Sequence, residues 1–293
     1  MNNFKKNLSN SLLAGAVLLA GATPAWAQVS LGDASDFSVL AATVTCTTSV
    51  IAGDVGIAPA TAFTNTGCTI TGAMPPATNT AALAARADFL SAYADMQLLT
   101  SSCIPVPGNL SGVELAPGVY CLDAVAKAGT LTLTGPSTGE WIFLVNGALT
   151  GTDFAVVMAG GAEACNVYWA PTGAATMTTS SFKGNILAGA PATAADPGSI
   201  TLTGGTLAGS VLANVAVTMT NASVVGCDVL SPSPSCKPKK HHDKHHGHDK
   251  DHKKCNQGVG NGSESCDPGH SNHHNSSNDE NGGKPGKPGR QGK

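Results

Sequence analysis

The chain has 293 residues and a formal net charge of −3, which is room for one large domain or two small ones. Residues 28–230 hold three basic and twelve acidic residues. This balance excludes a basic surface for nucleic acid, because affinity for phosphate backbones comes mainly from lysine and arginine.

The first 27 residues have the features of a secretory signal. Lys5 and Lys6 form a basic start, an apolar run extends from Leu12 to Ala22, and Ala25-Trp26-Ala27 fits a small-x-small cleavage site. The apolar run is shorter than a bilayer span of about 20 residues, and no later segment qualifies. We therefore predict a secreted, extracellular protein without a membrane span after signal cleavage, and we leave open an association with the cell surface. A retained membrane anchor is the less favoured alternative.

Nine cysteines in an exported chain favour disulfides over metal or redox chemistry. Six of them precede residue 231. Proximity in sequence and leftover pairing predict three bonds, although six cysteines allow 15 connectivities. The predicted pairs are Cys46–Cys68, Cys103–Cys121 and Cys165–Cys227. The remaining three, Cys236, Cys255 and Cys266, leave one thiol unpaired.

The residues at 79–100 predict one amphipathic helix. Apolar residues recur at spacings of three and four, which places them on one side of a helix. Thr78, Asn79 or Thr80 can cap its start, and Pro75-Pro76 prevents an earlier start. The apolar side consists of Ala82, Ala85, Phe89, Tyr93, Met96 and Leu99.

Short strand-like segments on both sides of this helix repeat a threonine-apolar-threonine pattern. The residues between the threonines are Ile70, Leu133, Met177, Leu202 and Met219. The last two steps are 25 and 17 residues, and Gly184, Gly209 and Gly226 follow at the same intervals. We place the eight extra residues in a loop within 190–198. A further coil fits between the second and third of these segments, with Leu149 or Gly151 beside Thr150 and Thr152.

A repeat of this length, made of strands and tight turns, predicts a solenoid in which each coil is buried by its neighbours. Alternation along a strand turns the central apolar residue inward and both threonines outward. Stacked coils then set threonines about 4.8 Å apart between coils and about 6.7 Å apart along a strand. The result is a flat array of hydroxyl and methyl groups.

Several stretches in a fixed order resemble the ice-binding-like family of secreted microbial antifreeze proteins, over about residues 29–227. They are LGDASDFSVLA from Leu31, GDVG from Gly53, AYAD from Ala92, LAPGVY from Leu115, WIF from Trp141, ACNVYW from Ala164 and GNILA from Gly184. The resemblance implies a mostly β fold, a discontinuous right-handed β-solenoid of triangular section with one long α-helix packed alongside. It also implies that residues 28–230 form one domain.

The same resemblance implies adsorption to ice through a flat face rich in small residues. We expect the chain to be a monomer without a cofactor. The predicted ice-binding residues are Thr69, Thr71, Thr132, Thr134, Thr176, Thr178, Thr201, Thr203, Thr218 and Thr220. The alternative explanation is that threonine is simply a good strand residue on a solvated face. A second, less regular candidate face pairs Lys183 with Asn185, Ala208 with Ser210, and Val225 with Cys227.

Two other functions fit the sequence less well. A cell-surface adhesin or matrix scaffold, binding a surface or a polysaccharide, could use the same solenoid without ice affinity. A polysaccharide-degrading enzyme needs paired carboxylates, or a basic residue with a metal site. The acidic residues of 28–230 are scattered, and all nine histidines lie after residue 230. We therefore predict that the chain is not an enzyme.

The segment 231–293 is rich in histidine, lysine and glycine and cannot build a core, so we predict a disordered tail. Clustered imidazoles can bind zinc, nickel or copper. A weak metal site is therefore a hypothesis, although the spacing of a zinc finger is missing and a simple hydrophilic tail is favoured. The histidines concerned are His241, His242, His245, His246, His248 and His252.

Overall fold

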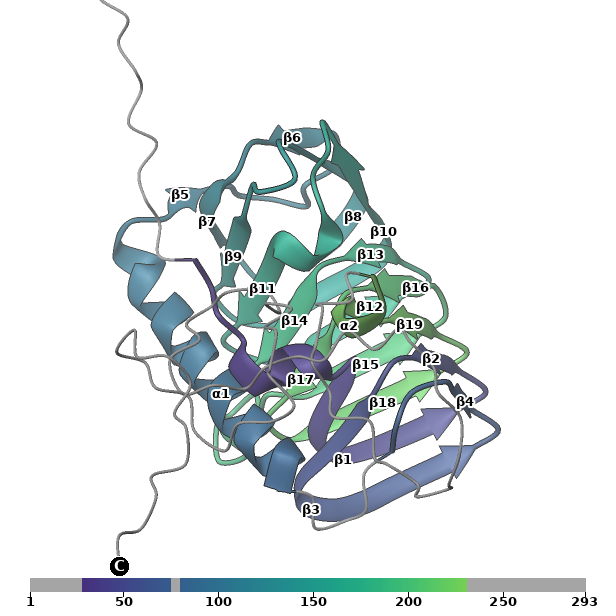
Figure 1. Ribbon diagram of the computed structural model, residues 1–293. Coiled ribbons are helices and arrows are strands. Elements are labelled where there is room, and N and C mark those ends of the chain that lie inside the picture. The colour runs from purple at the N-terminus through teal and green to yellow at the C-terminus, as the bar shows by residue number, and fades with distance from the viewer. Residues whose placement is uncertain (1–27, 75–79, 231–293) are drawn as a thin grey trace, which may run out of the picture.

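The computed structural model describes residues 28–74 and 80–230. The predicted signal, the predicted tail with its histidines, and two of the possible helix caps, Thr78 and Asn79, lie outside these residues. The described part forms a stack of parallel strands that belong to one 19-stranded sheet, with one long helix along its side (Figure 1). The predicted discontinuous β-solenoid with a helix alongside is confirmed.

The first strands and the long helix have the following bounds: β1 Val39–Thr47, β2 Val50–Ala52, β3 Val55–Thr66, β4 Thr69–Ile70, α1 Thr80–Gln97, β5 Ile104–Pro105, β6 Val113–Leu115, β7 Gly118–Leu122, β8 Lys127–Thr134 and β9 Trp141–Val145. The later elements are β10 Leu149–Ala159, β11 Val167–Pro171, β12 Ala175–Thr178, β13 Ser181–Lys183, β14 Asn185–Ala188, β15 Ile200–Thr203, β16 Thr206–Ala208, β17 Val211–Ala213, β18 Ala216–Thr220, β19 Ser223–Val225 and α2 Cys227–Leu230. Three 3₁₀ turns complete the list: η1 Gly32–Asp36, η2 Leu98–Ser101 and η3 Ala164–Asn166.

The order of the coils in space differs from their order in the chain. Strand β1 lies between β18 and β3 and pairs in parallel with both. The chain leaves this end after β4, follows α1 to the opposite end, and returns through β7 to β19 (Figure 1). The last coils therefore pack on the first ones, and buried residues of both belong to one interior cluster.

One side of the stack is covered by α1, and we call it the helix-covered face. Two of its strands, β9 and β11, consist of apolar and aromatic residues and are buried at every position. A parallel strand buried on both sides needs such a continuous run. Outward residues such as Leu40, Ile142 and Leu187 belong to the same buried cluster as Phe89 of the helix, and all four are at most 1% exposed.

The helix is predicted at 79–100 and observed as α1 followed by η2. Its buried residues are Ala82, Ala85, Phe89, Ala92 and Met96. Tyr93 and Leu99, which were expected on the same side, are half-buried and pack against the same cluster. The predicted apolar side is thus confirmed with one addition, Ala92.

The interior of the solenoid is filled by aromatic rings at the end nearest β7 and by aliphatic side chains elsewhere. The rings of Phe143 and Trp169, from neighbouring coils, stack with centroids 4.0 Å apart. The rings of Phe154 and Trp169 pack edge-on, with centroids 6.3 Å apart. Each such buried side chain contributes roughly 1.5–3 kcal/mol.

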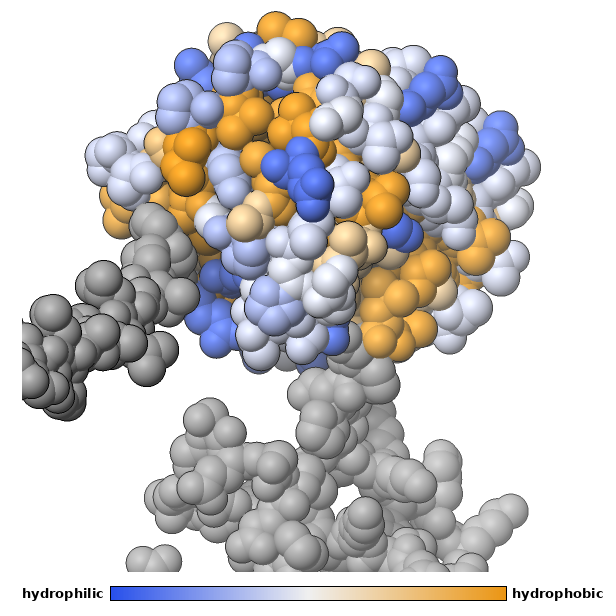
Figure 2. Space-filling model, turned by 90° about the horizontal axis from the view of Figure 1, so that it is seen from above, coloured by the Kyte–Doolittle hydropathy of each residue, from blue (hydrophilic) through white to orange (hydrophobic). Residues whose placement is uncertain are grey.

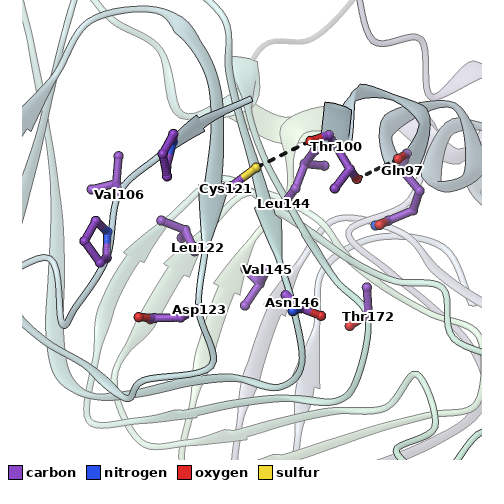
Figure 3. A pocket seen from close by; sticks show the side chains of 12 residues that line it. Gln97, Thr100, Val106, Cys121, Leu122, Asp123, Leu144, Val145, Asn146 and Thr172 are labelled. Carbon is purple, nitrogen blue, oxygen red and sulfur yellow. Dashed lines mark hydrogen bonds between the residues drawn. The ribbon is translucent and has the colours of Figure 1, made fainter. Parts of the chain in front are cut away.

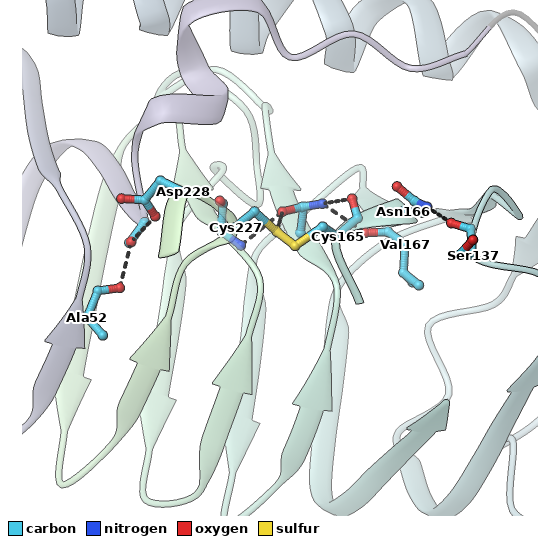
Figure 4. The surroundings of a disulfide bond; sticks show 10 residues. Ala52, Ser137, Cys165, Asn166, Val167, Cys227 and Asp228 are labelled. Atoms are coloured by element: carbon cyan, nitrogen blue, oxygen red, sulfur yellow. Dashed lines mark hydrogen bonds between the residues drawn. A yellow bond between two sulfur atoms is a disulfide. The ribbon is translucent and has the colours of Figure 1, made fainter. Parts of the chain in front are cut away.

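The three predicted disulfides are all present, and no described cysteine is free. The bond between Cys165 and Cys227 joins a middle coil to the end of the domain (Figure 4). Beside it, Asp228 accepts hydrogen bonds from the Ser38 hydroxyl at 2.7 Å and from the Asp54 backbone N–H at 3.2 Å. These contacts tie the last described residues to the first coil.

Both ends of the solenoid expose apolar side chains. The end that carries β5 and β6 exposes Leu98, Ile104 and Val125, and apolar surface is visible when this end is viewed from above (Figure 2). At the other end, Phe63 and Ile70 are only partly buried. Within the described residues, no helix is long and apolar enough to cross a membrane.

Candidate functional site

Six strand segments share the pattern small-x-Thr-x-Thr, and their outward residues form one side of the solenoid, which we call the threonine face. The segments, in spatial order, are 148–152, 174–178, 199–203, 216–220, 43–47 and 62–66. The notation x stands for an inward residue, such as Met177, Leu202 or Met219, each at most 3% exposed.

The threonines of these six segments stand in strict parallel register. One column contains Thr150, Thr176, Thr201, Thr218, Thr45 and Thr64. The other contains Thr152, Thr178, Thr203, Thr220, Thr47 and Thr66. With about 4.8 Å between coils and about 6.7 Å along a strand, each column is about 24 Å long.

A third column of small residues runs beside the first column of threonines. Thr43 pairs with Ala216 and with Ala62, and Ala148, Ala174 and Ser199 occupy the same place in their own segments. All eighteen outward positions of the threonine face are threonine, serine or alanine. The face therefore carries no charge and no side chain long enough to interrupt a flat surface.

The hydroxyls of the twelve column threonines are available to water. Other threonine hydroxyls are bound within the protein, for example that of Thr134 to Glu114 at 2.7 Å. Among the described residues, none of the twelve side-chain hydroxyls donates a hydrogen bond to a protein group or accepts one from it. The side chains are half-buried or exposed, so their methyl groups also lie at the surface.

Each segment of the threonine face ends at a corner where the backbone is left-handed. The corner residues are Asp153, Thr179, Gly204, Asn221, Thr48 and Gly67, with φ between 44° and 76°. The left-handed region is open to glycine and, at low cost, to asparagine and aspartate. This repeated turn sends every coil around the same corner at the same position, which keeps the columns straight.

The structure corrects the expected single array of five threonine pairs. Three pairs, those of β12, β15 and β18, are in register on the threonine face. The other two lie on the neighbouring side, because Ile70 pairs with Ile51 and Leu133 pairs with Met158. Thr69, Thr71, Thr132 and Thr134 therefore do not belong to the threonine face. Alternation along a strand shows which residues point outward, but it does not show on which side of a triangular coil they point.

Three threonine pairs were missed or left unsettled by the sequence. The pair Thr45 and Thr47 and the pair Thr64 and Thr66 were not recognised, and Thr150 with Thr152 was only one of two choices. The five-residue pattern does not separate the sides either, because residues 67–71 and 130–134 also match it and are followed by glycine. The pairing register between coils is needed to assign a segment to its side.

The second side that remains exposed, which we call the mixed face, is chemically irregular. Its strands are β6, β13, β16, β19, β2, β4, most of β8 and the second half of β10. Lys183, Ala208 and Val225 share one of its columns, as expected for the second candidate face. The prediction is wrong for Asn185 and Ser210, because both are at most 1% exposed and therefore do not lie on a surface. Asn185 instead donates to the carbonyl of Cys165 at 2.9 Å.

A pocket of about 470 Å³ lies between the end of α1 and strands β7 and β9 (Figure 3). Its walls are mainly apolar, and Asp123 is the one carboxylate among the twelve lining residues. Burial raises the pKa of Asp123, but hydrogen bonds from Gly108 and Lys127 and the charge of Lys127 outweigh this and hold the pKa below its ordinary value. The Lys127 ammonium, itself buried, lies 3.1 Å from this carboxylate. One carboxylate held in an ion pair does not provide the pair that glycoside hydrolysis needs.

A family model matches most of the described solenoid. Residues 39–225 match the model described as Ice-binding-like. The chain belongs to the ice-binding-like family. The matched residues include all six segments of the threonine face.

Relatives of this family member come from bacteria and fungi. It is 32% identical to an ice-binding protein of Flavobacterium frigoris over 182 residues, which are 54% of this chain and 64% of that protein. It is 31% identical to ice-binding protein K1-A of Typhula ishikariensis, over 61% of this chain and 82% of that protein. The chain thus spans slightly less than two thirds of the Flavobacterium relative.

Solved structures support the fold of this family member. The ice-binding protein of the ascomycete Antarctomyces psychrotrophicus aligns with a TM-score of 0.60 and 30% identity, over 68% of this chain and 98% of that structure. An ice-binding protein from an Arctic yeast aligns with a TM-score of 0.56 and 28% identity, over 68% of this chain and 94% of that structure.

Proposed function

We propose that the chain is a secreted protein that adsorbs to ice through the threonine face. The observation that carries the proposal is the pair of in-register columns, twelve threonines whose hydroxyls have no partner among the described residues. Membership of the ice-binding-like family supports ice as the ligand, and the columns support this face as the surface that adsorbs to it.

The chemistry of the face suits ordered water. Hydroxyl groups at a fixed spacing can each donate to and accept from water, while the methyl groups between them favour an ordered first shell. Water held in this way can merge with the lattice of an ice crystal. A charged side chain would instead hold water in the geometry of its own hydration shell, and the eighteen outward positions contain none.

The rigidity of the face limits the entropy lost on adsorption, which is a large cost of any association. Each inner threonine segment is paired on both sides, as β15 is with β12 and β18. Cys46 lies between Thr45 and Thr47 and is bonded to Cys68, which fixes the segment of β1. The array is therefore formed before it meets ice.

Thermal hysteresis, the gap between the melting and freezing temperatures of a crystal in solution, tests the proposal. The purified protein should produce a hysteresis gap and shape growing crystals into faceted forms. A protein of similar size without affinity for ice should do neither at the same molar concentration. Round, freely growing crystals and no gap at high protein concentration would contradict the proposal.

A further inference from the structure

Two corners of the threonine face carry the same side-chain arrangement with a different charge. At one corner the Thr179 hydroxyl donates to the carboxylate of Asp153, which belongs to the neighbouring coil. At another the Thr48 hydroxyl donates to the side-chain oxygen of Asn221, at 2.5 Å, again between neighbouring coils. All four residues are exposed and have positive φ.

The charged corner borders directly on the array of threonines. Asp153 follows Thr152, an exposed member of the second column, and Asn221 follows Thr220 of the same column. A carboxylate is far more costly to strip of its water than a neutral amide. Water around Asp153 is therefore held in a shell that does not match the array, whereas the amide of Asn221 can exchange hydrogen bonds with ordered water as the threonines do.

We propose that Asp153 determines how far the ice-adsorbing surface extends, ending it at the corner within β10, while the neutral corner at Asn221 allows it to continue. This inference rests on the proposed function. It assigns a role in ice affinity to a residue outside the threonine columns, and it makes the charge rather than the hydrogen bond the deciding property.

A reciprocal exchange of the two side chains tests this role. Asp153→Asn makes the charged corner identical to the neutral one, and Asn221→Asp does the reverse. Each new side chain can still accept from its threonine partner and tolerates the left-handed backbone. Asp153→Asn should lower the concentration needed for half-maximal hysteresis by about five-fold, equivalent to about 1 kcal/mol. Asn221→Asp should raise it by a similar factor, and the double exchange should return it close to wild type.

Thermal unfolding of all four proteins is the control, and their melting temperatures should agree closely because each hydrogen bond is kept. A wild-type protein without hysteresis would contradict the proposed function and this inference together. Hysteresis in the wild type that either single exchange leaves unchanged, or moves in the opposite direction, would overturn the role of Asp153 alone.

Discussion

Some corners of the solenoid require glycine, and Gly209 shows the requirement most clearly. Its φ is 144°, and an added Cβ would overlap the carbonyl group of Gly184 in the neighbouring coil. Strain and overlap together predict that Gly209→Ala lowers the free energy of unfolding by about 2–4 kcal/mol. Gly67 also has positive φ, at 76°, but its nearest neighbour would be 3.8 Å away. Gly67→Ala should therefore cost only about 1–2 kcal/mol. Denaturant unfolding measures both, and equal costs would contradict the close approach at Gly209.

Glu140 predicts a dependence of stability on pH. Burial raises the pKa of its carboxyl group above the ordinary value, only partly offset by the hydrogen bond that the Val29 N–H donates to it at 3.0 Å. The folded state thus favours the neutral form, so the contribution to stability is complete at low pH and is lost as pH rises through the folded pKa. The ionised carboxylate also contributes, after burial, to raising the pKa of Tyr168.

Glu140→Gln should therefore be more stable than the wild type at neutral pH, because the amide is neutral and can still accept from Val29. The difference should shrink as pH falls through the pKa of Glu140 and vanish below it. Melting temperatures of both proteins across pH check this. A difference that stays constant with pH would mean that the charge of Glu140 is not the cause.

At the scale of elements, the docking of α1 depends on its inward side chains. Phe89 is fully buried against the helix-covered face, so Phe89→Ala should lower the free energy of unfolding by about 3–5 kcal/mol. Leu83 lies on the same helix but is 49% exposed, and Leu83→Ala should change stability by no more than about 0.5 kcal/mol. Urea titrations of both variants measure these changes. Similar losses from the two would show that the helix does not dock as described.

The elements themselves could be predicted because their signals are local. The spacing of Ala85, Phe89 and Met96 marks one side of a helix, and the threonines of 201–203 mark an outward strand surface. The sides of the coil were harder to separate. Runs such as 141–145 are apolar throughout because both surfaces of their strands are buried, and this signal identifies the side under α1. The threonine and mixed faces share the same alternation, so only the register between coils distinguishes them.

At the scale of the whole molecule, the spatial order of the coils could not be derived from repeat intervals. The N-terminal segments 43–47 and 62–66 extend the threonine face because β1 packs on β18, a contact between residues more than 170 positions apart in sequence. Repeat spacing is informative only for coils that follow one another in the chain. The discontinuous arrangement was predicted from the resemblance to the family. A third of the column threonines, those of segments 43–47 and 62–66, were found only from the register between coils.

The central claim, that the threonine face is the surface that adsorbs to ice, is tested most directly by two tyrosine substitutions. Thr203 and Thr206 are both exposed and lie three residues apart, the first on the threonine face and the second on the mixed face. A bulky ring at Thr203 would hold ice away from the columns, whereas one at Thr206 would project from the other side of the corner. The concentration needed for half-maximal hysteresis should rise by about ten-fold or more in Thr203→Tyr, as expected for a loss of about 1.4 kcal/mol or more, and stay near wild type in Thr206→Tyr. Full activity in Thr203→Tyr with loss in Thr206→Tyr would contradict the account.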